Sequence, residues 1–278
     1  MAQQTDKTAS GQELFFESHN PSASTTIVLL HGLFSCHLEW EHVVPYLADY
    51  HLIIPDHPHH SRSKLIRPFS LPLAADKVAA LIEQHANGGK AYVVGLSLGG
   101  FVTMELIRRH PQLVEAAFVT GSAPFSDWQV WASQRPSMLH WGLWFVMSSG
   151  LYRAAEWHTA LKPHNQLKSE MAANNQWDLV HDAYGELSRW QEEAVKDLGA
   201  KDKRILVVAG GHGDNLGCTK KLAEGLRQEG GKDGKETRGV FVNDAIHGWN
   251  LQFPELFADG IKAWIKREPL PERFEALP

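Results

Sequence analysis

The chain has 278 residues, of which 43% are apolar and 21% charged, a composition typical of a globular protein with a large buried core. Its formal net charge is −5 and it carries no long basic run, which argues against nucleic acid or an anionic membrane surface as the main partner. The two cysteines make no disulfide framework, and no apolar run is long enough for a signal peptide or a bilayer span, so we expect a cytoplasmic protein with reduced thiols.

Short β-branched runs alternate with helical patterns along the chain. The runs are residues 25–30, 51–56, 91–95, 116–121, 204–210 and 239–244. They are apolar throughout, which is typical of strands buried on both faces of a parallel sheet. Apolar residues at helical spacing predict helices within 71–86, 100–111 and 254–268. This alternation predicts an α/β fold with helices on both sides of the sheet.

The alternation stops between about Pro124 and Gly199, where no run predicts a strand. This stretch holds seven of the ten tryptophans, namely Trp128, Trp131, Trp141, Trp144, Trp157, Trp177 and Trp190. We expect residues 124–199 to form a helical lid over a core domain made of residues 1–123 and 200–278. Trp141 and Trp144 lie at helical spacing, which predicts a face that packs on the core, lines a substrate pocket, or does both.

One serine lies in a sequence motif whose small residues have a steric explanation. Ser97 lies in the sequence GLSLG, residues 95–99, between a predicted strand and a predicted helix. Small residues two positions before and after the serine let the chain turn sharply without a Cβ clash, and the turn exposes the hydroxyl above the sheet. This context predicts Ser97 as a nucleophile. The alternative is a glycine-rich turn without chemistry.

A serine hydroxyl needs a base, and the base needs an orienting acid. After a turn of this kind, the acid precedes the histidine along the chain. His247 follows the last predicted parallel strand and is the predicted base; Asp214 follows the strand before it and is the predicted acid. Asp127 and Asp244 are the alternatives, although Asp244 is too close to His247 in sequence for an easy reach to the imidazole.

Backbone N–H groups are the predicted donors to the oxyanion. Leu98 opens the helix directly after the serine, and Leu33 follows a His-Gly pair after the first predicted parallel strand. Phe34 is the neighbouring alternative to Leu33. Phe34 and Trp249, which lies two residues after the predicted base, are also candidate substrate-binding residues.

Five segments resemble the α/β-hydrolase superfamily in the family's order. They are LLHGL, PDHPHHSRS, GLSLGG, GGHGDN and IHGWNLQFPELF, and the resemblance extends over residues 25–265. It implies a mostly parallel eight-stranded sheet, a helical lid and a triad of Ser97, His247 and Asp214, but no particular substrate. A serine at the turn differs from the aspartate of haloalkane dehalogenases and epoxide hydrolases, and the absence of HGGG differs from hormone-sensitive-lipase-type esterases.

The segment after the second parallel strand departs from the family pattern. Many members carry D-x-P-G-H-G-x-S there, whereas this chain has DHPHHSRS, residues 56–63. His59 and Ser61 replace glycines, and His57 is additional. His57, His59 and His60 have no acid or cysteine at a familiar ligand spacing, so we expect a polar loop near the active-site mouth, and no metal or other cofactor. The alternative is a histidine that contacts the substrate.

These predictions favour a serine hydrolase that cleaves a carboxylic ester or lactone of a bulky apolar or aromatic small molecule through an acyl-enzyme. The same triad also serves C–C bond hydrolysis, acyl transfer, or a lyase or cyclase step, because fold and triad do not fix the substrate. A third hypothesis is a ligand-binding protein that kept the fold and lost turnover, for which a broken triad would be expected. The sequence gives no indication of the oligomeric state.

Overall fold

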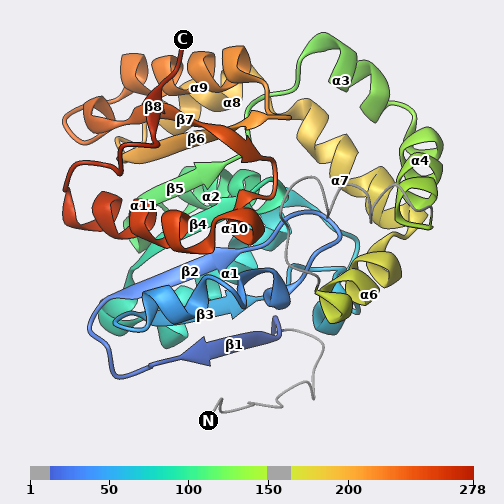
Figure 1. Ribbon diagram of the computed structural model, residues 1–278, viewed down its shortest axis with the longest axis horizontal. Coiled ribbons are helices and arrows are strands. Elements are labelled where there is room, and N and C mark those ends of the chain that lie inside the picture. Colours follow the sequence, from blue (N-terminus) through green and yellow to red (C-terminus); the bar gives the residue numbers. More distant parts are fainter. Residues whose placement is uncertain (1–12, 149–163) are drawn as a thin grey trace.

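The computed structural model describes residues 13–148 and 164–278. These residues form one eight-stranded sheet in the order β1-β3-β2-β4-β5-β6-β7-β8 (Figure 1). The strands are β1 (Phe16–His19), β2 (Thr26–Leu30), β3 (His51–Pro55), β4 (Ala91–Leu96), β5 (Val114–Thr120), β6 (Ile205–His212), β7 (Arg238–Ile246) and β8 (Glu275–Ala276). The edge strands β1 and β8 are antiparallel to their neighbours and all other pairs are parallel, which confirms the mostly parallel sheet.

Every strand predicted from an apolar run is present. β2 and β3 are buried at all positions, and consecutive residues face opposite sides of the sheet, since Leu29 and Leu30 belong to different core clusters. The apolar runs did not predict the two edge strands. β1 is partly exposed along its whole length and β8 has two residues, so neither has the apolar run that marks a central strand.

Helices cover both faces of the sheet. α1 (Leu71–His85), α2 (Leu98–Arg109) and α9 (Leu216–Glu229) contribute to the core cluster that contains Leu30. α11 (Pro254–Lys266) contributes to the opposite cluster, and the four-residue α10 (Trp249–Gln252) precedes it. The predicted helices over 71–86, 100–111 and 254–268 are therefore confirmed within a few residues. No helix in the described ranges is long and apolar enough to cross a membrane.

In the described part of the segment between β5 and β6, all regular secondary structure is helical. It contains α3 (Asp127–Ser133), α4 (Pro136–Ser148), α6 (Asn165–Asn174), α7 (Trp177–Arg189) and α8 (Glu192–Gly199). Figure 1 shows α3, α4, α6 and α7 gathered at one end of the molecule. Leu187 of α7 and Leu198 of α8 belong to the same core cluster as the sheet, so the division into core and lid stays a prediction. Residues 149–163, with Trp157, lie outside the described residues.

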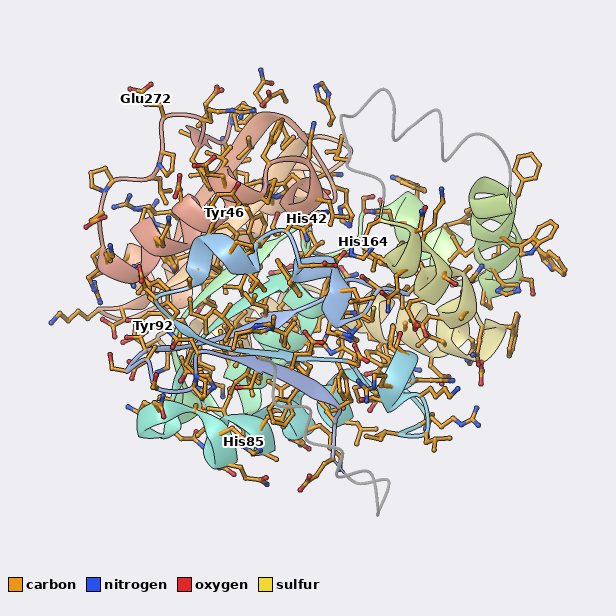
Figure 2. The ribbon with its side chains drawn as sticks, turned by 60° about the horizontal axis from the view of Figure 1, so that its bottom comes forward. His42, Tyr46, His85, Tyr92, His164 and Glu272 are labelled. Atoms are coloured by element: carbon orange, nitrogen blue, oxygen red, sulfur yellow. The ribbon has the colours of Figure 1, made fainter. Side chains whose placement is uncertain are left out.

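α6 is fastened to the sheet domain at its first turn. His164, the residue before α6, donates through Nε2 to Glu41 Oε2 at 2.6 Å, and its Nδ1 accepts the N–H of Leu167. Its ring also lies 5.7 Å from that of His42, centroid to centroid (Figure 2). These contacts hold the start of α6 against the segment that follows β2.

Candidate active site

Ser97 occupies a strained turn between β4 and α2. Its φ of 52° and ψ of −117° lie outside the regions that serine ordinarily adopts. The neighbouring strand stabilises this conformation, since Ser97 N–H donates to Thr120 O at 2.8 Å and the Ser122 hydroxyl donates to Ser97 O at 2.8 Å. The turn therefore depends on contacts from the end of β5 as well as on its own sequence.

The glycines around Ser97 leave no room for a side chain. A Cβ on Gly95 would lie 2.3 Å from Gly99 O, and a Cβ on Gly99 would lie 2.1 Å from Leu30 O. Both distances are far below van der Waals contact with backbone atoms, which have no freedom to move away. The geometry agrees with the steric reason for which these glycines are expected around the serine.

His247 and Asp214 form a hydrogen-bonded pair at the carboxyl ends of β7 and β6. His247 Nδ1 donates to Asp214 Oδ1 at 2.6 Å, and Asp214 Oδ2 accepts the N–H of Gly210 at 2.7 Å. Desolvation lowers the pKa of His247, but the hydrogen bond and charge of Asp214, together with the charge of Glu39, outweigh it and raise the pKa above 6.5. The Asp214 carboxylate therefore stabilises the protonated form of the imidazole, relative to a histidine without such a partner.

The two alternative acids lie elsewhere. Asp244 forms an ion pair with Arg273, and Asp127 is exposed at the first position of α3. Asp214 is the carboxylate that contacts the imidazole directly.

Gly121, just after β5, brings the histidine close to the serine turn. Its φ is 64°, and a Cβ placed on it would lie 2.6 Å from His247 Cε1 and 3.5 Å from Asp214 Oδ1. The imidazole therefore packs against the backbone of Gly121, one residue after Thr120, which accepts the Ser97 N–H. A side chain at position 121 would displace the histidine.

Ser97, His247 and Asp214 line one cavity of about 470 Å³, a size suited to a small molecule. The predicted residues Leu33 and Phe34 also line it. The apolar part of the lining comes from both the sheet domain and the helical segment, and includes Leu96, Phe101, Ala123, Pro124, Phe125, Met171, Tyr184, Leu187, Ile246 and Leu251.

The loop after β2 passes directly beside the serine. A Cβ on Gly32 would lie 3.6 Å from Ser97 Cβ, and Ser35 N–H donates to Gly32 O at 3.2 Å, which closes a tight turn through Leu33. Phe34 has a φ of 68° within that turn. Leu98 is the first residue of α2, where backbone N–H groups have no partner within the helix. Of the two predicted oxyanion donors, Leu98 thus follows Ser97 directly in the chain, and Leu33 follows Gly32, which lies beside Ser97 in space.

The three tryptophans predicted to bind substrate lie outside the lining of this cavity. Trp141 and Trp144, on α4, are 61% and 53% exposed. Trp249 is fully buried against Phe118 and Phe257, and its Nε1 donates to Thr120 Oγ1 at 2.9 Å. For Trp141 and Trp144, helical spacing identifies an apolar face, but the direction of that face depends on tertiary packing. Trp249 was predicted from its closeness to His247 in the sequence, which does not determine where its side chain packs.

Glu39 also lines the cavity and was not predicted from the sequence. Glu39 lies in the 3₁₀ turn η1 (His37–Trp40), is 7% exposed, and accepts the N–H of Gly32 through Oε2 at 2.7 Å. Burial raises its pKa to about 7, although the bond from Gly32 and the charge of His247 act in the opposite direction. The one sequence feature that could have indicated Glu39 is its position directly before a tryptophan, Trp40, which the structure buries.

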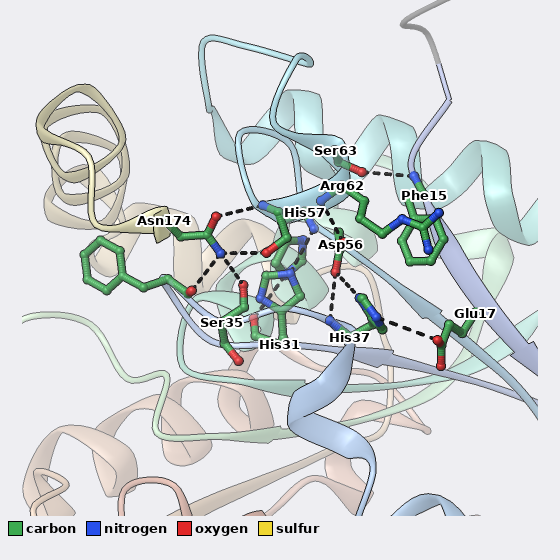
Figure 3. Close-up of polar contacts among 12 residues, drawn as sticks. Phe15, Glu17, His31, Ser35, His37, Asp56, His57, Arg62, Ser63 and Asn174 are labelled. Atoms are coloured by element: carbon green, nitrogen blue, oxygen red, sulfur yellow. Dashed lines mark hydrogen bonds and ion pairs between the residues drawn. The ribbon is translucent and has the colours of Figure 1, made fainter. Parts of the chain in front are cut away.

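Asn174, the last residue of α6, was also not identified. It is 4% exposed, and its Nδ2 donates to Phe34 O, Ser35 O and Ser61 Oγ at 2.9, 3.1 and 2.8 Å (Figure 3). Its Oδ1 accepts the N–H of Ser61 at 2.8 Å. Asn174 thereby joins the helical segment to the loop that carries Leu33. More than 100 residues separate it from these partners in the sequence, so no local pattern signals the contact.

The histidine segment is buried rather than part of a polar mouth. His57, His59 and His60 are 0%, 2% and 0% exposed and are not among the residues that line the cavity. His59 and Ser61, which replace the family's glycines, have φ values of 67° and 41°, so the backbone keeps the left-handed conformation that glycine adopts easily. Packing with His31, 4.3 Å from the His57 ring, explains the burial.

Cys36, His37 and Asp56 form a cluster whose donor atoms lie within 4.8 Å of one another. Asp56 Oδ1 accepts from both the backbone N–H and Nδ1 of His37 at 2.8 Å, and Oδ2 accepts the N–H of Arg62 at 3.1 Å (Figure 3). Burial raises the pKa of the Cys36 thiol to about 12. The carboxylate is therefore engaged in protein hydrogen bonds and the cysteine is a neutral thiol, an arrangement that suits a structural network.

Comparison with known proteins agrees with this geometry. A family model described as the alpha/beta hydrolase fold matches residues 25–145. The chain is 32% identical over 276 residues to an AB hydrolase superfamily protein of Gibberella zeae, covering 95% of this chain and 88% of that protein. It is 33% identical over 103 residues to a pimeloyl-[acyl-carrier protein] methyl ester esterase of Neisseria meningitidis, covering 37% of this chain and 38% of the esterase. A thermophilic esterase from Thermogutta terrifontis shares the fold with a TM-score of 0.67 at 18% identity, covering 91% of this chain and 93% of the esterase.

Proposed function

The chain belongs to the α/β-hydrolase superfamily, and we propose that it is a serine hydrolase that cleaves a carboxylic ester or lactone of a small molecule with a bulky apolar or aromatic acyl group. One observation carries the proposal: Ser97 at a strained strand–helix turn and the His247–Asp214 pair line the same cavity. The esterases among the similar proteins support the reaction class. The apolar lining, with Phe101 and Phe125, supports the acyl group.

In the proposed mechanism, Ser97 Oγ attacks the carbonyl carbon while His247 takes the hydroxyl proton. Because His247 Nδ1 donates to Asp214, the other ring nitrogen, Nε2, is the basic atom. The N–H groups of Leu33 and Leu98 stabilise the negative oxygen of the tetrahedral intermediate. His247 then gives the proton to the departing alcohol, and a water molecule, deprotonated by the same imidazole, releases the acid and regenerates Ser97.

The proposal is tested by hydrolysis of p-nitrophenyl esters from acetate to longer and aromatic acyl chains. Loss of the nucleophile in Ser97→Ala is expected to lower kcat/KM by roughly 10³-fold or more, because the base and acid have no hydroxyl to activate. Ser22→Ala, at an exposed serine that bonds to Asn20, serves as the matched control and should leave the rates unchanged. The chain-length profile then measures the size of the acyl pocket. Equal rates in wild type and Ser97→Ala would contradict the proposal.

The same experiment separates the alternative reactions. A folded protein that cleaves a β-diketone in a Ser97-dependent manner, but none of the esters, would favour C–C bond hydrolysis over ester hydrolysis. A protein that binds such compounds without turning them over would favour the ligand-binding hypothesis.

A further inference from the structure

Glu39 is a second carboxylate beside the proposed nucleophile and base. A Cβ on Gly32 would lie 3.6 Å from Ser97 Cβ and 3.8 Å from both carboxylate oxygens of Glu39, so Gly32 lies between the two side chains. The side chain of Glu39 lines the same cavity as Ser97 and His247. It is 7% exposed, so its charge is screened far less than that of a surface carboxylate.

The contacts of Glu39 hold the loop that follows β2 and place a carboxylate near the imidazole of His247. Glu39 Oε2 accepts the N–H of Gly32 at 2.7 Å, and the next residue, Leu33, carries the proposed oxyanion donor. Among the described residues, the ionisable groups whose charges act on His247 are Asp214 and Glu39, and His247 is the ionisable group that acts on Glu39. Asp214 occupies Nδ1 of the imidazole, so the two carboxylates act on the ring in different ways.

We propose that Glu39 is a positioning residue of this site, which holds the oxyanion loop through Gly32 N–H and stabilises the imidazolium that His247 becomes when it takes the proton of Ser97. The inference rests on the proposed function, since it requires Ser97 and His247 to act as nucleophile and base. A buried carboxylate stabilises the charge pair of the transition state without any reorganisation of solvent. The same charge disfavours substrates with an anionic group close to the scissile bond.

Two substitutions separate the two roles. Glu39→Gln keeps an oxygen that accepts the Gly32 N–H and removes the charge. Glu39→Asp keeps the charge but is one methylene shorter, so it loses the bond to Gly32. Glu115→Gln is the matched control, because Glu115 is 48% exposed, pairs with Lys90 and is not among the residues that line the cavity.

The test measures the rate at which a fluorophosphonate labels Ser97 between about pH 5 and pH 9. This readout needs the nucleophile and base but no knowledge of the substrate. Because the pKa of Glu39 is about 7, its carboxylate is charged in the upper part of this pH range and protonated in the lower part. In Glu39→Gln we therefore expect the part of the acidic limb near and above pH 7 to move to lower pH, because the imidazole loses a neighbouring negative charge there. The maximal rate should fall about 3- to 10-fold. Glu39→Asp should keep the midpoint and lower the rate, and Glu115→Gln should match wild type.

The outcomes distinguish the two proposals. If wild type is labelled at Ser97 and Glu39→Gln has the same pH profile, the role of Glu39 is overturned and that of Ser97 stands. If wild type is not labelled at Ser97 at any pH, both are overturned. Should Glu39→Gln fail to fold, Glu39→Asp decides, because a midpoint that shifts although the charge is kept would contradict the electrostatic role.

Discussion

At the scale of single residues, steric contacts within its own turn constrain Ser97, whereas the charged groups that line its cavity come from other segments of the chain. Gly95 and Gly99 face backbone atoms at less than 2.5 Å from a virtual Cβ, so their identity is dictated by local geometry that a motif records. Glu39 lines the same cavity as His247 but lies far from it in sequence. A pattern of residues along the chain contains no information on that approach, so the sequence predicts Ser97, His247 and Asp214 as site residues but gives no indication of Glu39.

Replacing Asp214 tests its proposed role in orienting the catalytic base. In Asp214→Asn the carboxylate that orients His247 Nδ1 is replaced by an amide, and kcat/KM should fall roughly 10⁴-fold. The remaining activity should show an acidic limb at lower pH, because the hydrogen bond and charge that raise the pKa of His247 are lost.

The measurement is the pH dependence of kcat/KM for the best p-nitrophenyl ester. Asn215→Ala is unsuitable as a control because Asn215 caps α9. Asp259→Asn, at a half-buried residue of α11 that pairs with Lys262, removes an equivalent charge away from the cavity. An unchanged limb in Asp214→Asn would show that another group sets the pKa of the base.

At the scale of elements, the parallel strands and their flanking helices follow from apolar patterns, but the cavity wall does not. Met171 of α6 and Tyr184 of α7 line the cavity, whereas Trp141 and Trp144 of α4, which were predicted to form its wall, are 61% and 53% exposed and are not among its lining residues. The apolar periodicity of a helix can be read from its own sequence. Which face of the helix turns toward the sheet depends on contacts with other parts of the chain, such as those that Asn174 makes.

Asn174 provides a prediction for the junction between α6 and the oxyanion loop. In Asn174→Ala the carbonyls of Phe34 and Ser35 lose a buried donor, so the free energy of unfolding should fall by about 1–3 kcal/mol. The loop that carries Leu33 also loses its tether, so we expect kcat to fall about 10-fold or more with a smaller change in KM.

Urea unfolding and steady-state kinetics on the same ester check both effects. Asn165→Ala, at the exposed first residue of the same helix, controls for a general effect on α6. A loss of stability with unaltered kcat would mean that Asn174 is structural only and that the oxyanion loop keeps its position without it.

At the scale of the whole molecule, a group of buried histidines couples stability to pH. His31 donates through Nδ1 to Gly32 O and accepts the N–H of His57 through Nε2, at 2.8 and 2.9 Å, so its ring must be neutral. His57 and His60 are packed beside it. Desolvation and the neighbouring histidines lower all three pKa values, that of His31 well below 6.5, that of His57 to about 3 and that of His60 to about 4.

These pKa shifts determine whether acidification raises or lowers the free energy of unfolding. Below about pH 6.5 the unfolded chain protonates the three histidines and the folded protein does not, so acidification favours unfolding until the folded-state pKa values are reached. Each such proton contributes about 1.4 kcal/mol per pH unit. Glu39 acts in the opposite direction, because its raised pKa makes the folded protein bind a proton that the unfolded chain releases down to about pH 4.5.

We therefore expect the free energy of unfolding to fall between about pH 6.5 and pH 5 with a net uptake of roughly two protons on unfolding. Urea titrations at a series of pH values measure this slope. His181→Gln, at a half-exposed surface histidine, should leave the slope unchanged. A flat profile in this range would contradict the burial of neutral imidazoles.

The central claim, that Ser97 is a nucleophile activated by His247, is tested most directly by finding where a fluorophosphonate attaches. Wild-type protein is incubated with the reagent, digested, and its peptides are examined by mass spectrometry, with Ser97→Ala and His247→Ala in parallel. We expect one stoichiometric adduct on Ser97, none in Ser97→Ala, and labelling slowed at least about 100-fold in His247→Ala. An adduct on another residue, or labelling of Ser97→Ala at the wild-type rate, would contradict the claim.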